Sequence, residues 1–200
     1  MTKLSDTFLP GEPSGGGGKF LNLKKLKEMK DRTIRFRILT PFITGHCRFK
    51  ADKRPLRVRL GGKFPSGVQW GLGFDGTEQQ SRPFWAAFVW SEAGGIQVFE
   101  FQQGSVHRQL KELVNEAEWG IPTGYDVRIK STGEGKDTEY SVLPCPKALL
   151  PKAAAAEWEA FSQSCAGLDA LYSGGDPFAP FGEDDGAPQA PIENDEDIPF

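Results

Sequence analysis

Positively charged side chains and flat aromatic rings are interspersed between residues 35 and 90 of this 200-residue chain. Lysine and arginine neutralise phosphates, and an aromatic ring stacks on an unpaired base with about 1–3 kcal/mol. The segment therefore has the side chains that a single-stranded nucleic acid requires. The candidate cations are Arg35, Arg37, Arg48, Lys50, Lys53, Arg54, Arg57, Arg59 and Lys63, and the candidate rings are Phe42, Phe49, Phe64, Trp70, Phe74, Trp85 and Trp90.

Each ring and each arginine pair also has a simpler explanation. For any one phenylalanine in this set, a place in the hydrophobic core is as good an explanation as a stacking role. Arg57 and Arg59 could lie on a solvated strand face without binding a ligand. Trp70 is the strongest stacking candidate because QWGLGF is a glycine-rich stretch in which a buried indole is harder to accommodate.

The net charge of −3 conceals two segments of opposite sign. Residues 19–82 carry 16 basic and 5 acidic side chains, whereas residues 153–200 carry 11 acidic side chains and no lysine or arginine. We expect a polyanion to bind the first of these segments.

Other classes of function find little support in the residue types. Cys47, Cys145 and Cys165 form no CxxC pair, and with His46 and His107 they show no zinc-finger spacing, so we expect neither disulfides nor a metal. No nucleophile elbow, phosphate-binding loop or HExxH motif is present, and the chain is expected to be neither an enzyme nor a cofactor carrier. With no signal-like or membrane-spanning apolar run, we expect a cytoplasmic protein without a membrane partner.

Alternating apolar and polar residues indicate the strands that must position these side chains. Residues 33–39 (TIRFRIL) and 56–60 (LRVRL) each place two arginines on one face. Residues 84–90 and 96–101 form a predicted hairpin, and so do residues 125–131 and 138–143. Residues 50–83 are expected to be a long basic loop with short strands.

One amphipathic helix is predicted between the two hairpins, with Ser105 as its N-cap. This order is that of a mainly β, five-stranded oligonucleotide/oligosaccharide-binding (OB) barrel, with its helix between strands 3 and 4. A generic α+β domain or an SH3-like barrel would give a similar pattern.

The remaining segments flank this domain, which we place at residues 19–150. Residues 1–18 are expected to be a flexible Gly-rich arm, and residues 151–173 an amphipathic helix that caps the barrel or meets a second subunit. Residues 174–200, rich in Gly, Pro and acids, are expected to be a disordered acidic tail.

The last six residues, Asp195, Glu196, Asp197, Ile198, Pro199 and Phe200, resemble the C-terminal tip of bacterial single-stranded DNA-binding proteins. In that family the tip docks on replication, recombination and repair enzymes. The resemblance implies the same kind of partner for this tail, with the Phe200 ring in an apolar pocket and its carboxylate on a basic side chain.

Residues 15–150 are more similar to the single-stranded DNA-binding proteins of tailed phages. The similarity lies in the Gly-rich entry to IRFRIL, the Phe-Trp-rich strand, and WGIPTGYDVRI followed by a glycine turn and TEYSVLPCP. It implies a phage-type protein that acts in the host cytoplasm, binds single-stranded DNA with little sequence preference, and serves replication, recombination or repair. A homo-oligomer is compatible with it, but the bacterial tetramer is not implied.

Three alternatives stay open at this point. They are an RNA chaperone of the cold-shock type, a DNA-processing enzyme whose site has no recognisable motif, and an adaptor whose basic body binds a protein.

Overall fold

The computed structural model describes residues 19–29, 31–73 and 75–181. Its strands are β1 (Phe20–Leu21), β2 (Thr33–Ile38), β3 (Ile43–Phe49), β4 (Pro55–Arg59), β5 (Arg82–Ser91), β6 (Gly95–Phe101), β7 (Tyr125–Thr132) and β8 (Glu139–Lys147). Its helices are η1 (Leu23–Glu28), α2 (Gly104–Asn115), η2 (Gly135–Asp137), α3 (Lys152–Ser162) and α4 (Ala170–Ser173), of which η1 and η2 are 3₁₀ helices.

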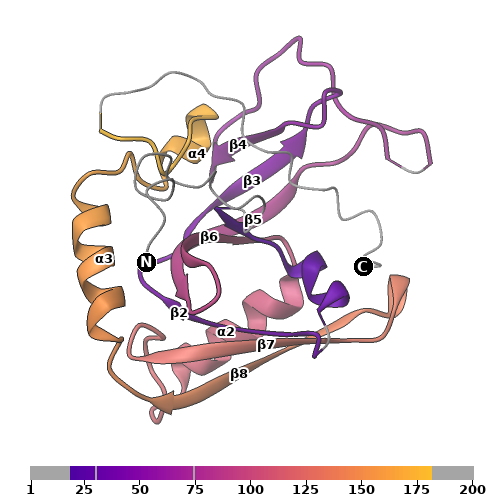
Figure 1. Cartoon of the computed structure of the whole chain (residues 1–200). Coiled ribbons are helices and arrows are strands. Elements are labelled where there is room, and N and C mark those ends of the chain that lie inside the picture. The colour runs from indigo at the N-terminus through magenta and orange to yellow at the C-terminus, as the bar shows by residue number, and fades with distance from the viewer. Residues whose placement is uncertain (1–18, 30, 74, 182–200) are drawn as a thin grey trace, which may run out of the picture.

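The described strands form one mostly antiparallel sheet in the order β1-β6-β5-β2-β7-β8 (Figure 1). β3 and β4 lie off this path, since β3 pairs with β5 on one side and with β4 on the other. The predicted hairpins are confirmed as β5–β6 and β7–β8, and α2 lies between them as predicted.

The predicted five-stranded barrel is wrong, because the described sheet is open. Closure would place β6 beside β8, but both edges have other partners. β1 pairs in parallel with β6, and the N–H of Val98 donates to the carbonyl of Lys19 at 2.7 Å. The side chain of Gln109 in α2 takes the free edge of β8, donating to the carbonyl of Tyr140 and accepting from the N–H of Val142, each at 2.8 Å. These bonds satisfy backbone groups that a closing strand would otherwise pair.

β5 is buried on both faces and separates two hydrophobic clusters. Ala87 and Val89 point into the first cluster, which β2, β7, β8 and the apolar face of α2 complete. Phe84, Ala86 and Phe88 point into the second cluster, on the other face of the sheet. This double burial explains why FWAAFVW is apolar at almost every position, where a one-sided strand would alternate.

α2 begins two residues earlier than predicted. Its N-cap is Gln103, whose carbonyl accepts the first helical hydrogen bond from the N–H of His107 at 3.1 Å, so Ser105 lies inside the first turn. The expectation of a Ser105 cap is therefore wrong.

The predicted helix over residues 151–173 is two helices, α3 and α4, with a break between them. Gly167 has a φ of +81°, a left-handed conformation that ends helical geometry. The expected apolar stripe does pack on this chain's own sheet: Cys165 and Leu168 are buried in the second cluster, against which Trp158 and Phe161 lie.

Residues 174–181, which composition assigned to the tail, continue this packing. The ring of Phe178 lies 5.7 Å from that of Phe88 and 5.5 Å from that of Phe161, measured between centroids. Pro180 also forms an isolated β-bridge with Cys165. The part of the chain packed on the body therefore extends at least to Pro180.

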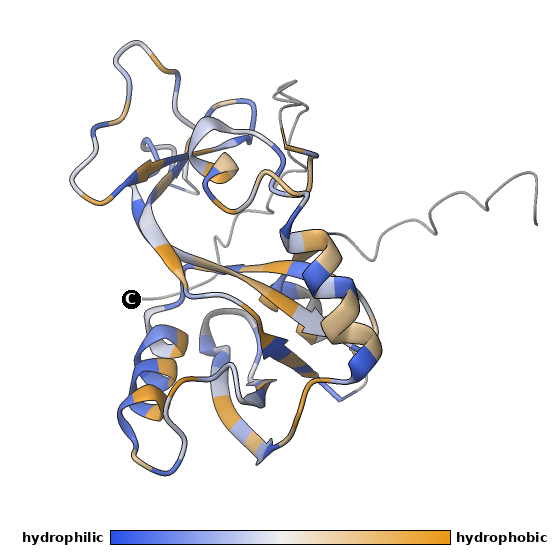
Figure 2. Ribbon diagram, turned by 90° about the vertical axis from the view of Figure 1, so that its left-hand side faces the viewer, coloured by the Kyte–Doolittle hydropathy of each residue, from blue (hydrophilic) through white to orange (hydrophobic). Residues whose placement is uncertain are grey.

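β3, β4, residues 50–54 between them and the described residues between 60 and 81 project beyond the rest of the sheet, and we call them the basic lobe (Figure 1). Figure 2 shows the loops of this lobe in mixed hydrophilic and hydrophobic colours at the end of the molecule opposite β7 and β8. Among the helices of the described ranges, none has the length and apolar character needed to cross a membrane.

Candidate nucleic-acid interface

Arg48 and Trp70 form the centre of the basic lobe. The guanidinium carbon of Arg48 lies 4.2 Å from the centroid of the Trp70 ring, a cation–π stack. Arg48 is held there by its Nε, which donates to the carbonyl of Gln79 at 2.6 Å, and by its Nη2, which donates to Glu78 at 2.7 Å. Phe64 meets Trp70 edge-on, with 5.4 Å between centroids.

Trp70 is half-buried, and an isolated β-bridge to Lys50 fixes its backbone. It is therefore partly accessible, as a stacking ring must be, although Arg48 already occupies part of its π surface. The structure brings together these two candidates, which are 22 positions apart in the sequence.

The other cations of the lobe lie in two segments that contact Trp70: residues 50–54 through the Lys50 bridge, and residues 63–64 through the Phe64 ring. Lys53, Arg54 and Lys63 are exposed, and Lys50 is half-buried. One acid lies among them: Asp52 is 3.7 Å from both Lys50 Nζ and Arg54 Nε. A hydrogen bond from the Arg54 N–H, together with these two cations, lowers the pKa of Asp52. Lys53 and Lys63 thus present charge on the surface of the lobe.

Arg57 was expected to face solvent, and that expectation is wrong. Its side chain is 0% exposed, and its Nε and Nη2 donate to the two carboxylate oxygens of Glu100 at 2.9 and 2.8 Å. Burial opposes its charge, but Glu100 offsets this and the pKa of Arg57 is raised. Burial also raises the pKa of the neighbouring Cys47 to about 12. Because this pair is buried, Arg57 presents no charge to a ligand at the surface.

Phe49 is buried in the second hydrophobic cluster, so its proposed stacking role is also wrong. Arg59 is exposed, yet it is engaged with the C-terminal segment. Its Nη2 lies 3.0 Å from Asp169, and its guanidinium lies 4.4 Å from the centroid of the Tyr172 ring.

Arg35 and Arg37 point to the same face of β2, as the alternation predicts, and both bind Asp126 of β7. Arg35 Nε donates to Asp126 Oδ2 at 2.8 Å, and Arg37 Nε donates to Asp126 Oδ1 at 2.7 Å. Arg37 is buried and also donates to the carbonyls of Thr123 and Ala148. Trp90 pairs with Arg37 across the β2–β5 ladder. This group lies apart from the basic lobe.

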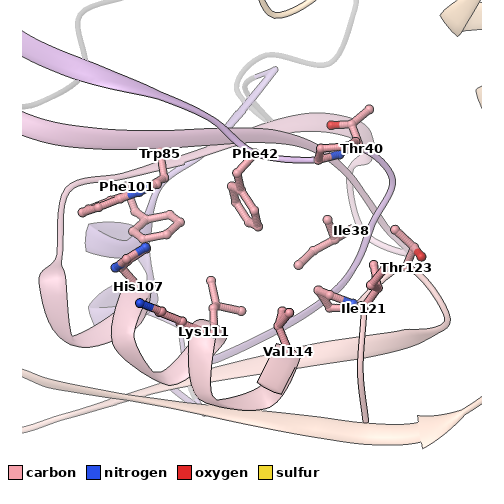
Figure 3. A pocket seen from close by; sticks show the side chains of 13 residues that line it. Ile38, Thr40, Phe42, Trp85, Phe101, His107, Lys111, Val114, Ile121 and Thr123 are labelled. Carbon is pink, nitrogen blue, oxygen red and sulfur yellow. The ribbon is translucent and has the colours of Figure 1, made fainter. Parts of the chain in front are cut away.

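Trp85 lines a pocket of about 390 Å³ between α2 and the sheet (Figure 3). Its ring stacks on His107, with 4.1 Å between centroids and 13° between planes, and on Phe101, at 5.5 Å and 24°. Phe42 contacts Phe101 edge-on at 5.9 Å. Burial, and then the charge of Lys111, lower the pKa of His107, which favours its neutral form.

Sequence reasoning missed Phe101, His107 and Lys111 as members of this pocket. The lining comes from the end of β2 with residues 40–42 after it, from β5, from the end of β6, from α2 and from residues 121–123, and no local pattern connects these segments. The only available signal was the presence of His107 and Lys111 on one face of the amphipathic helix, four residues apart.

Two parts of the predicted site lie outside the described residues. They are Phe74 and the tail Asp195, Glu196, Asp197, Ile198, Pro199 and Phe200. Within the described ranges, no group of three or more His, Cys, Asp or Glu side chains is placed to hold a metal ion.

Comparison of the chain with protein-family models, with curated proteins and with solved structures finds no match.

Proposed function

We propose that this protein binds single-stranded DNA with little sequence preference, through the basic lobe. The observation that carries the proposal is the Arg48–Trp70 stack, a partly accessible ring in a lobe that also carries the surface cations Lys53, Arg54 and Lys63. Surface cations together with a stacking ring match the two requirements of a single strand, phosphate neutralisation and base stacking.

The strand order supports an OB-type body. Without β1, β3 and β4, five strands remain, which follow one another in the sequence as β2, β5, β6, β7 and β8. In the sheet they lie in the order β6-β5-β2-β7-β8, which is third, second, first, fourth and fifth, and α2 lies between the third and the fourth in the sequence. OB folds are partly open five-stranded barrels that bind oligonucleotides with loops, including the loop between strands 1 and 2. The basic lobe lies between β2 and β5, the position of that loop.

The acidic tail supports a second role, the recruitment of other proteins. We propose that Ile198, Pro199 and Phe200, preceded by acids, recruit replication, recombination or repair enzymes to the bound strand. A short apolar tip with a terminal carboxylate and neighbouring acids is suited to a basic-rimmed pocket on a partner.

The salt dependence of binding tests the lobe directly. Each phosphate contact on a single strand contributes about −0.7 to the slope of log K against log salt. Replacing Lys53, Arg54 and Lys63 by Ala should therefore make the slope for oligo(dT) shallower by about 2. The matched control replaces Arg128, Lys130 and Lys147, three exposed cations of β7 and β8, and should leave the slope nearly unchanged.

Both variants lose three positive charges, so a difference between them reports position and not net charge. Equal loss of slope in the two variants would show that the lobe has no special role, and the proposal would then be wrong.

A further inference from the structure

The pocket beside Trp85 has the size and the lining of a small-ligand site. Its volume of about 390 Å³ lies within the range of pockets that enclose one small molecule. Figure 3 shows Phe42, Ile38, Lys111 and Val114 around an open centre, with Trp85, Phe101 and His107 along one side. The centre of the pocket is therefore bordered by flat rings and aliphatic side chains.

The polar groups of the lining restrict the chemistry of the ligand. Lys111 is the one side chain that carries a full charge in the lining, and no carboxylate is present there. Thr40 and Thr123 add hydroxyls at one end. The lining thus favours a flat, mostly apolar group that carries a single nearby negative charge, as a nucleobase with its phosphate does.

One face of β3 leads from the strand position next to Trp85 to Arg48 in the basic lobe. Thr44 pairs directly with Trp85, so both side chains lie on the same face, and Arg48 lies on this face because it is four residues further along β3. At about 3.3 Å per residue, Thr44 and Arg48 are about 13 Å apart. A single strand with bases stacked 3.4 Å apart would cover this distance with about four nucleotides.

We propose that the pocket between α2 and the sheet holds one unpaired base of a bound single strand, next to Phe42 and Trp85, with Lys111 on its phosphate. The inference rests on the proposed function and extends it. The strand would cross the lobe at Arg48 and Trp70 and insert one base at the pocket, so the pocket would be a second contact, distinct from the lobe.

A variant that fills the pocket tests this inference. Val114 lies at the pocket and is 42% exposed, so Val114→Trp should add an indole there with little cost to the fold. Leu143 is also 42% exposed but lies on β8 and is not part of the pocket, which makes Leu143→Trp the matched control. Urea unfolding of both variants should show similar stability.

The readouts are affinity for oligo(dT) and photo-crosslinking of an oligo(dT) in which 5-iodouracil replaces thymine. Loss of one base contact should weaken binding about 5- to 150-fold in Val114→Trp and less than twofold in Leu143→Trp. In the native protein, adducts are expected on Phe42, Trp85 or His107, and they should disappear in Val114→Trp while adducts on Trp70 remain.

Three results would overturn the pocket assignment. Unchanged affinity in Val114→Trp with no pocket adduct in the native protein would do so, and binding to the lobe would still stand. Protection of the pocket by a peptide of residues 193–200, without any base adduct there, would show that the pocket takes an acidic peptide instead. Failure of the native protein to bind oligo(dT) at all would overturn the proposed function, and the pocket inference with it.

Discussion

Removal of the Arg57 side chain should destabilise the fold and leave nucleic-acid binding to the lobe intact. Arg57 is 0% exposed in its side chain and Glu100 is 4% exposed, and the two are joined by a bidentate contact. Breaking such a buried pair from one side typically costs about 3–5 kcal/mol, because the other charge is left without compensation. For a chain of this size each kcal/mol lowers Tm by about 2–4 °C, so Arg57→Met should lose about 6–20 °C.

A double variant gives this prediction further content. In Arg57→Met the carboxylate of Glu100 stays buried without its partner. Arg57→Met combined with Glu100→Leu should recover most of the lost stability, because no unpaired charge remains.

The assays are urea unfolding followed by tryptophan fluorescence and oligo(dT) titration at several salt concentrations. The double variant keeps the net charge and should show the native salt slope. A stability loss below about 1 kcal/mol in Arg57→Met, together with a slope shallower by about 0.7 in the double variant, would show that Arg57 contacts phosphate and that the structural reasoning is wrong.

Three further outcomes are expected. Trp70→Ala should weaken oligo(dT) binding by about 1–3 kcal/mol with a nearly unchanged salt slope, as measured by fluorescence titration; lost stability without lost affinity would identify a core residue. Gln109→Ala leaves two backbone groups of β8 without their partner, so the free energy of unfolding in urea should fall by about 1–3 kcal/mol. An unchanged free energy would show that water replaces the amide of Gln109. The pKa of His107 is lowered in the fold, so its contribution to stability is present above pH 6.5 and is lost as pH falls. His107→Gln should therefore reduce the change in unfolding free energy between pH 7 and 5, and the same change in variant and native protein would contradict this prediction.

The strands could be predicted from the sequence where their apolar residues form a clear run or alternation. Residues 33–39, 84–90, 96–101 and 125–131 show clear runs, and the structure confirms strands there. β3 was missed because ITGHCRF contains a glycine and lies between the prolines at positions 41 and 55, which favour a loop. The alternation in LRVRL predicted the two faces of β4, but not that Glu100 covers one of them.

The open edges of the sheet and the pocket depend on contacts that no local pattern contains. The edge of β8 is taken by one amide, that of Gln109, and this side chain is an ordinary helix residue in the sequence. The pocket likewise assembles from five separate segments. Trp70 was a better candidate because its glycine-rich surroundings indicate a loop near the surface, and the structure places it beside Arg48 in the basic lobe.

A titration of fluorescent oligo(dT) against a duplex of the same length, at several salt concentrations, tests the central claim most directly. Stacking on Trp70 requires bases that are already unpaired, so the affinity for oligo(dT) should exceed that for the duplex by about 100-fold or more. With about five phosphate contacts, log K for oligo(dT) should fall against log salt with a slope of about −3.5. Equal affinity for the two nucleic acids would contradict the assignment of the basic lobe as a single-strand interface.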